Sequence, residues 1–254
     1  MAGTFRASGE AGPGFAYGGV CCLSKDLAEG LSGGAVFLEQ DLFPQLAEAG
    51  RLAAGVYPGL FVGLSDPEAL DRAGDALAGW KRRPALFLDR DGVLNVNYGY
   101  VHTRDKWTWC PGARKAVKFA NDAGLLVILV TNQSGIGRGY YGEDAFHELM
   151  AWVREDLAGV GAHLDGVYHC PHHPTEAVGD FRRECACRKP GPGMLLQALD
   201  EWDIDVARSA VIGDSDKDIE AGRHAGISRL RLYDHERESL LDVVRDVFSF
   251  LSDE

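Results

Sequence analysis

Residues 85–95 read Ala-Leu-Phe-Leu-Asp-Arg-Asp-Gly-Val-Leu-Asn, an apolar run that ends in two aspartates and a glycine. Four consecutive apolar residues followed by charge are typical of a short strand that is buried on both faces, as in a parallel sheet. Gly92 permits a sharp change of chain direction directly after the carboxylates. The stretch therefore predicts a buried strand whose carboxyl end presents Asp89 and Asp91.

The rest of the chain repeats this pattern, because apolar runs alternate with amphipathic stretches. The predicted strands are 85–88, 125–130, 166–169, 209–212 and 230–233, and the predicted helices lie near 112–123, 143–158, 192–201, 216–224 and 236–251. This alternation indicates βαβ units in a parallel sheet with helices on both faces. We expect an α/β fold with a Rossmann-like, doubly wound parallel sheet over residues 84–254 and a small N-terminal extension over residues 1–83.

The composition excludes several classes of protein. The 254 residues are 46% apolar and 25% charged, which is enough to bury a sizeable core. A net charge of −12 argues against nucleic acid or an anionic membrane surface as a partner, because both require a basic surface. No apolar run approaches the roughly 20 residues that span a bilayer, and the N-terminus lacks the apolar segment of a secretory signal. We expect a cytoplasmic protein.

Polar residues that suit phosphate chemistry follow the predicted strands or precede a predicted helix. They are Asp89 and Asp91, Thr131, Arg188 and Lys189, and Gly213-Asp214 with Asp218. In parallel sheets the carboxyl ends of the strands form one rim, where ligands bind. Each residue taken singly has an ordinary explanation as a surface or turn residue, as for the similar pair Asp203 and Asp205. Their common position at one rim predicts a catalytic site.

A second group combines cysteines with histidine. Cys170-Pro171-His172 and Cys185-Ala186-Cys187 are separated by twelve residues between His172 and Cys185. Three thiolates and one imidazole complete a tetrahedral Zn²⁺ shell with no open position, which is typical of a structural site. His169 and His173 are rival imidazoles, and reduced thiols without metal are the alternative. Zinc would order this loop and fix the residues that follow it.

The strand-end residues, in this order along the chain, resemble the four motifs of the haloacid-dehalogenase-like phosphohydrolases. The resemblance implies a phosphatase fold over roughly residues 84–235. No insertion is long enough for a large cap domain, so the lid is expected to consist of residues 92–110 and the cysteine loop.

The resemblance also implies a role for each motif residue. Asp89 would attack phosphorus to give an aspartyl phosphate, and Asp91 would protonate the leaving oxygen and then activate water. Thr131 and Lys189 would hold the phosphoryl oxygens. The implied Mg²⁺ ligands are Asp89, the main-chain carbonyl of Asp91, and Asp214, with Asp218 as an additional support.

Further motifs narrow the resemblance to the branch that includes histidinol-phosphate and heptose-bisphosphate phosphatases. They are Cys-Pro-His-His-Pro at 170–174, Cys-Arg-Lys-Pro at 187–190 and Asn-Val-Asn-Tyr-Gly-Tyr-Val-His at 95–102. In this branch the zinc ligand is the first histidine after Cys-Pro, here His172. The implied contacts to a small phosphorylated sugar are Asn97, Tyr98, Gly99, Tyr100, Asn132, Gln133, Ser134 and Arg188. An arginine fork fits phosphate in a bidentate manner, so Arg188 is expected to hold a distal phosphate. Ser215 departs from the pattern, because some heptose phosphatases carry lysine there.

The implied reaction is hydrolysis of the 7-phosphate of a heptose 1,7-bisphosphate, which supplies nucleotide-activated heptose for surface polysaccharide. A phosphatase for histidinol phosphate or another small sugar phosphate is one alternative, and a zinc-stabilised interaction module without activity is another. The sequence leaves the oligomeric state open.

Residues 1–80 resemble the tail of a sugar-phosphate nucleotidyltransferase, at 37–44 and 59–68, without that family's catalytic head. Gly63 stands where that family has aspartate. We expect an inactive remnant used for packing or oligomerisation, with a separate nucleotidyltransferase as a further partner. A plain helical extension is the alternative.

Overall fold

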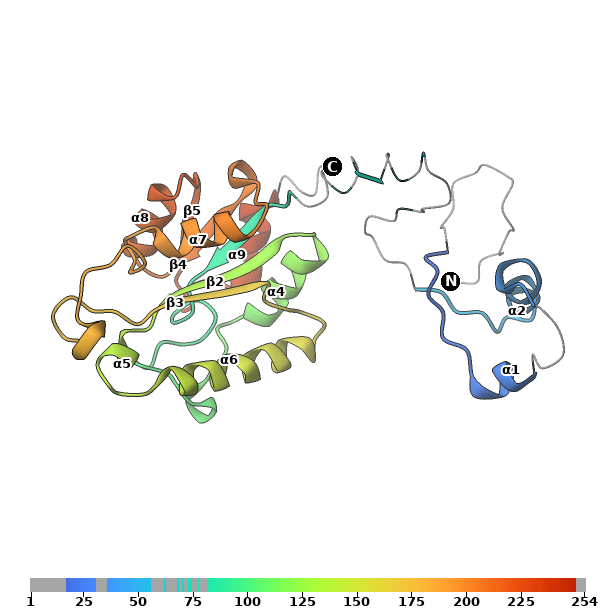
Figure 1. Cartoon of the computed structure of the whole chain (residues 1–254), viewed down its shortest axis with the longest axis horizontal. Coiled ribbons are helices and arrows are strands. Elements are labelled where there is room, and N and C mark those ends of the chain that lie inside the picture. Colours follow the sequence, from blue (N-terminus) through green and yellow to red (C-terminus); the bar gives the residue numbers. More distant parts are fainter. Residues whose placement is uncertain are drawn as a thin grey trace. The chain divides into compact units, whose positions relative to one another are not determined.

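The computed structural model describes residues 17–30, 36–55 and 82–249 and the single positions 62, 68, 70, 73, 74 and 77. The chain separates into two compact units, Met1–Ala73 and Gly74–Glu254 (Figure 1). The sequence predicts a division between residues 83 and 84 instead. Among the described residues, no helix has the length and apolar character needed to cross a bilayer.

The larger unit is built on a five-stranded sheet with the order β3-β2-β1-β4-β5. Its strands are β1 (Ala85–Leu88), β2 (Leu126–Asn132), β3 (Gly166–Cys170), β4 (Ala210–Gly213) and β5 (Arg229–Leu232). All neighbouring strands pair in parallel. The four residues of β1 are fully buried, since this strand lies in the middle of the sheet and is covered on both faces. The predicted doubly wound parallel sheet is confirmed.

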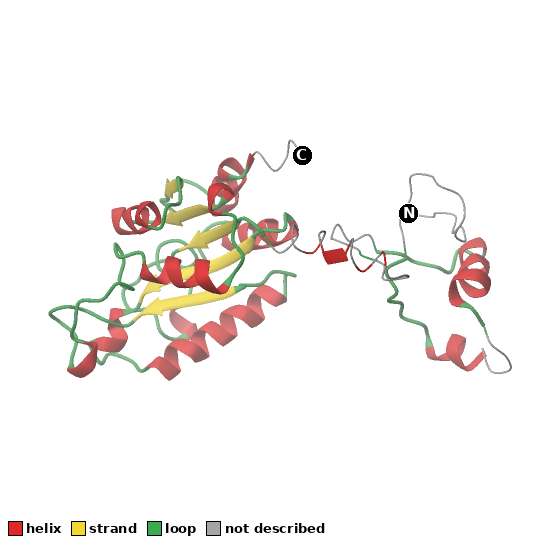
Figure 2. Cartoon of the chain, turned by 45° about the horizontal axis from the view of Figure 1, so that its top comes forward, coloured by secondary structure: helices red, strands yellow, loops and turns green. Residues whose placement is uncertain are grey.

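Helices cover both faces of this sheet (Figure 2). One face, which includes Leu86 and Leu88, packs against α4 (Ala113–Asp122), α6 (Glu143–Ala158) and α9 (Leu240–Val247). The other face, which includes Phe87, packs against α7 (Gly193–Glu201) and α8 (Asp216–His224). The alternation of side chains along each strand thus divides the core into two apolar layers.

Several elements differ in their bounds from the prediction, and two of the differences have a visible cause. Strand β2 extends to Asn132 because its last residues, Thr131 and Asn132, pair with His169 and Cys170 of β3. Helix α9 spans only Leu240–Val247, and the Leu240 amide donates to the Pro111 carbonyl instead of continuing a helix toward residue 236. The short helix α5 (Ser134–Gly137) directly after β2 was not predicted.

The smaller unit contains α1 (Lys25–Gly30), a π-helical turn over Leu38–Leu42 and α2 (Phe43–Glu48). Phe43 and Leu46 are buried, and the Tyr17 ring packs edge-on against Phe43 at 5.2 Å. The predicted site residues all lie outside this unit.

Candidate active site

The carboxyl ends of β1, β2 and β4 open into a cavity of about 410 Å³. Its wall includes every catalytic and substrate-contact residue that the sequence predicts, except Tyr98. The Tyr98 side chain is 62% exposed and lies outside this wall. The wall also contains Tyr141, Ser215 and Lys217, which sequence reasoning did not single out as contacts.

A buried lysine lies between two carboxylates at the base of the cavity. The Lys189 Nζ atom lies 2.8 Å from Asp89 Oδ1 and 2.5 Å from Asp218 Oδ1, and it donates to the Val130 carbonyl at 2.8 Å. Burial alone would lower the pKa of Lys189, but the charges of Asp89 and Asp218 outweigh it and raise that pKa above its ordinary value. Lys189 therefore stays a cation, which suits it to hold phosphoryl oxygens.

Three carboxylates gather around this lysine. One oxygen from each of Asp89, Asp214 and Asp218 lies within 4.8 Å of the others. Burial raises the pKa of Asp89 to about 7 although the Lys189 ammonium opposes the rise. Burial and the Asp218 charge likewise raise the pKa of Asp214 to about 6. The single positive charge of Lys189 does not balance three carboxylates. Such a cluster of oxygens fits a hard divalent cation such as Mg²⁺.

The backbone brings these carboxylates together at a glycine. Gly92 has φ +90°, and a Cβ atom there would lie 2.0 Å from Asp214 Oδ2. No side chain fits between the turn after β1 and the loop after β4. Glycine is therefore required at position 92 both for its positive φ and for the lack of space. Ser215, the position that departs from the family pattern, donates to Asp218 Oδ2 from its hydroxyl at 2.6 Å and from its amide at 3.1 Å. It fixes Asp218 at the start of α8.

Asp91 is held from its own turn by two donors. Its Oδ1 atom accepts hydrogen bonds from Arg90 Nη2 at 2.7 Å and from Asn95 Nδ2 at 3.0 Å. Arg90 is fully buried, with its guanidinium 6.0 Å from the Trp107 and Phe146 ring centroids. Sequence reasoning missed Arg90, because a charged residue between two aspartates gives no signal of burial.

The predicted substrate contacts differ in how free they are. Asn132 bridges the main chain of Lys189, since its Nδ2 donates to the Lys189 carbonyl and its Oδ1 accepts from the Lys189 amide, both at 3.1 Å. Gln133 is 2% exposed, and its side chain is engaged by protein groups. Asn97 accepts from the Gly99 amide at 3.0 Å. Ser134 and Tyr100 lie in the wall.

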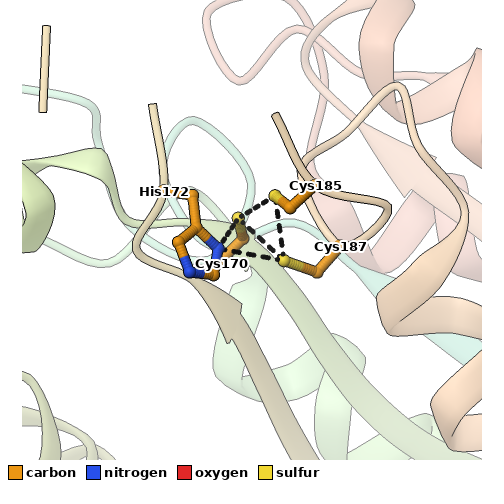
Figure 3. Close-up of side chains that lie close together, drawn as sticks. All are labelled: Cys170, His172, Cys185 and Cys187. Atoms are coloured by element: carbon orange, nitrogen blue, oxygen red, sulfur yellow. Dashed lines mark hydrogen bonds between the residues drawn. The ribbon is translucent and has the colours of Figure 1, made fainter. Parts of the chain in front are cut away.

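The cysteine loop brings together Cys170, His172, Cys185 and Cys187 (Figure 3). The three sulfur atoms lie 3.2 to 3.5 Å apart and form no disulfide. His172 Nδ1 lies 3.3 Å from the Cys187 sulfur and 3.6 Å from the Cys170 sulfur. Burial raises the pKa of the Cys170 thiol, which disfavours a thiolate in the absence of a cation. Three sulfurs and one ring nitrogen converging on one point fit Zn²⁺ in a closed structural site.

The rival histidines point elsewhere. His169 Nε2 lies 3.6 Å from Glu143 Oε1, and its ring packs against Phe146 at 4.4 Å. His173 Nδ1 accepts from the Glu176 amide at 3.1 Å. The structure thus places His172, and neither of the other two, beside the sulfurs.

The cysteine loop also contacts the catalytic cavity. Arg188, which follows Cys187 directly, donates from Nη1 to the His172 carbonyl at 3.1 Å and lines the cavity. The Gly193 amide donates to the Ala186 carbonyl at 2.8 Å and ties the loop to the start of α7. Arg188 and Lys189 are therefore positioned by the same loop that carries the sulfurs.

Comparison with known proteins agrees with this geometry. Residues 186–232 match the model of the HAD-hydrolase-like family. A putative haloacid-dehalogenase-like phosphatase from Mesorhizobium loti superposes with a TM-score of 0.60 at 30% identity, covering 79% of this chain and 91% of that one. The sheet, the aspartates after β1 and the lysine between carboxylates thus define a phosphatase of the haloacid-dehalogenase-like class.

Closer relatives narrow this class. The D-glycero-beta-D-manno-heptose-1,7-bisphosphate 7-phosphatase of Rhodopseudomonas palustris is 47% identical over 150 residues, which are 59% of this chain and 83% of the relative. The enzyme of the same name from Pasteurella multocida is 49% identical over 145 residues, 57% of this chain and 78% of the relative. The D,D-heptose 1,7-bisphosphate phosphatase of B. bronchiseptica, solved with magnesium and phosphate, superposes with a TM-score of 0.55 at 28% identity over 66% of this chain and 99% of that one. The chain belongs to the heptose-1,7-bisphosphate phosphatase family.

Proposed function

We propose that this chain is a Mg²⁺-dependent phosphatase that hydrolyses the 7-phosphate of D-glycero-β-D-manno-heptose 1,7-bisphosphate and so serves the supply of nucleotide-activated heptose. The observation that carries the proposal is the strand-end cluster, in which Lys189 lies between Asp89 and Asp218 beside Asp214. Relatives that are identical to this chain at nearly half of their aligned residues are named for this reaction. No observation favours histidinol phosphate over the heptose.

The roles of the residues follow from their positions. Asp89 attacks phosphorus as the bond to the sugar oxygen breaks, and an aspartyl phosphate, which is an acyl phosphate, is formed on its carboxylate. Lys189 and Thr131 stabilise the charge on the phosphoryl oxygens. Asp91 donates a proton to the leaving oxygen and later accepts one from the attacking water. Mg²⁺ held by Asp89, Asp214 and the Asp91 carbonyl would neutralise phosphate charge.

We assign Zn²⁺ to Cys170, His172, Cys185 and Cys187 in a structural role. The set has no fifth donor among the described residues and no place for a substrate, since its four ligand atoms face one another. Its effect on catalysis is indirect, through Arg188.

Residues 1–83 are proposed to serve packing or oligomerisation. The residues that line the cavity lie between Asp89 and Asp218. Deletion of residues 1–73 should therefore leave kcat/KM unchanged. It should alter at most the oligomeric state, that is, the number of chains per particle, which light scattering measures. A loss of activity in a folded truncated chain would contradict this assignment.

The test of the main proposal is phosphate release from both anomers of heptose 1,7-bisphosphate and from histidinol phosphate, with Mg²⁺ and with EDTA. We expect kcat/KM for the β anomer to exceed that for histidinol phosphate by about 100-fold or more, which is about 2.7 kcal/mol of transition-state binding. Equal rates on all three compounds would remove the substrate assignment. Activity that persists in EDTA would contradict the proposed dependence on Mg²⁺.

A further inference from the structure

The two oxygens of the Asp91 carboxylate are not equivalent. Oδ1 accepts two hydrogen bonds, from Arg90 Nη2 at 2.7 Å and from Asn95 Nδ2 at 3.0 Å. Oδ2 accepts one, from Gln133 Nε2 at 3.0 Å. A carboxylate oxygen has about two lone-pair sites for such bonds. Both sites on Oδ1 are therefore occupied, and one on Oδ2 remains free.

The Gln133 amide can present its donors to Asp91 in only one orientation. Its second N–H donates to Thr131 Oγ1 at 2.8 Å, and its Oε1 accepts from the Tyr141 hydroxyl at 2.7 Å. If the amide were turned around, Oε1 would face the Asp91 carboxylate, which can only accept, so the carboxylate decides which end of the amide faces it. The Tyr141 hydroxyl holds the amide in this orientation by donating to Oε1, and every polar group of the Gln133 side chain is satisfied within the protein.

Tyr141 is itself held firmly. Its ring stacks on His102 with a centroid distance of 4.6 Å and an interplanar angle of 7°. The ring also lies close to the main chain of Gly135, since a Cβ atom at that position would collide with Tyr141 Cε1. Burial raises the pKa of Tyr141 to about 12, so its hydroxyl stays protonated and remains a donor at neutral pH.

We propose that Gln133, locked by Tyr141, is a positioning residue that fixes the plane of the Asp91 carboxyl group and leaves Oδ2 as the atom that transfers the proton. This rests on the proposed function, which takes Asp91 as the acid and base. In the first step the proton on Oδ2 moves to the sugar oxygen as the P–O bond breaks and the bond from Asp89 to phosphorus forms. In the second step Oδ2 takes a proton from water as the water oxygen attacks phosphorus and releases Asp89. The role differs from the direct substrate contact that the family resemblance implies for Gln133.

The test compares leaving groups. A sugar oxygen needs a proton to leave, whereas p-nitrophenolate leaves without one, and kcat/KM reports on the steps up to the departure of the leaving group. In Tyr141→Phe we expect kcat/KM for the sugar phosphate to fall about 10-fold, and in Gln133→Met about 100-fold. For p-nitrophenyl phosphate both variants should lose several-fold less than for the sugar phosphate, and any loss in Gln133→Met that both substrates share would come from its hydrogen bond to Thr131.

Two further variants make the outcome decisive. Tyr168→Phe is the matched control, because its hydroxyl also donates to a side chain, Glu201 Oε2 at 2.6 Å, but outside the cavity wall. Tyr168→Phe should leave kcat/KM unchanged for both substrates. Asp91→Asn should show the same dependence on the leaving group as Gln133→Met.

If Asp91→Asn slows both substrates equally, the acid role in the proposed function is wrong and the inference falls with it. If Asp91→Asn discriminates between the substrates while Gln133→Met and Tyr141→Phe slow both equally, only the positioning role is overturned. Tyr141→Phe removes one oxygen atom and keeps the ring, so it gives a result even if Gln133→Met fails to fold.

Discussion

The chain carries two groups of side chains that could hold a metal, and they are built in different ways. In the first group, Asp89 and Asp214 follow strands and Asp218 lies in the first turn of α8, and the group already contains a cation, Lys189. In the second group, Cys170 ends strand β3 and the other three residues lie in the loop that follows, and the ligand atoms contact one another directly. The first group lines the cavity and is open to a substrate, whereas the ligand atoms of the second face one another. The difference separates a site for chemistry from a site for stability.

The largest effect is expected from a substitution of the proposed nucleophile, which should affect chemistry and leave stability nearly unchanged. Asp89→Asn should reduce kcat/KM by about 10⁴-fold or more, because an amide cannot attack phosphorus. The thermal midpoint should shift by no more than about 3 °C, because Lys189 keeps Asp218 as a partner. Kinetics and calorimetry on the same preparation check both. Asp216→Asn is the control, since this exposed carboxylate of α8 is not part of the cavity wall. Substantial residual activity in Asp89→Asn would exclude the covalent mechanism.

At the cysteine group we expect the main effect to be on stability and zinc content. Cys187→Ser should abolish stoichiometric zinc and lower the thermal midpoint by about 5–10 °C, since loss of the metal frees the loop. Activity should fall as well, because Arg188 and Lys189 follow this cysteine directly. Elemental analysis and calorimetry measure the effect, with the exposed Cys21→Ser as control. Full zinc content in Cys187→Ser would show that the ligands are assigned wrongly.

The sequence predicted these two groups unequally well. The five strands follow from apolar runs, and the strand-end aspartates follow from the strands, because a parallel sheet brings its carboxyl ends to one rim. The cysteine spacing predicted the metal group, but the choice of His172 over His169 and His173 depended on family resemblance. The packing of His169 on Phe146 has no signature in the local sequence.

Contacts between distant side chains could not be predicted. Gln133 and Asp91 are 42 positions apart, and their hydrogen bond depends on the rotamers of both residues. Arg90 is buried because Trp107 and Phe146, which belong to later segments, cover it. The exposure of Tyr98 also has no signature in the local sequence, and its contact with substrate stays a prediction.

The pH dependence of metal binding should differ between the two groups. Burial raises the pKa of Asp89 to about 7 and that of Asp214 to about 6. Protons therefore compete with Mg²⁺ below these values, and the competition disappears as pH rises through them. The apparent Mg²⁺ affinity, measured from activity at each pH, should increase about 10-fold from pH 6 to pH 8. Zinc content should stay constant over the same range. An Mg²⁺ affinity that does not vary with pH would contradict the raised pKa of Asp89.

Arg188 links the two groups, and the effect of its removal should depend on the substrate. Its side chain reaches the His172 carbonyl and the cavity wall. Arg188→Ala should lower kcat/KM for the bisphosphate about 10-fold and for the corresponding monophosphate less than about threefold, because only the bisphosphate presents a second phosphate to the guanidinium. Zinc content should be unchanged, since Arg188 bonds to the main chain of His172 and not to a ligand atom. The exposed Arg182→Ala, in the same loop, is the matched control. Equal losses on both substrates would mean that Arg188 supports the loop, and the separation between stability and chemistry would then fail at this residue.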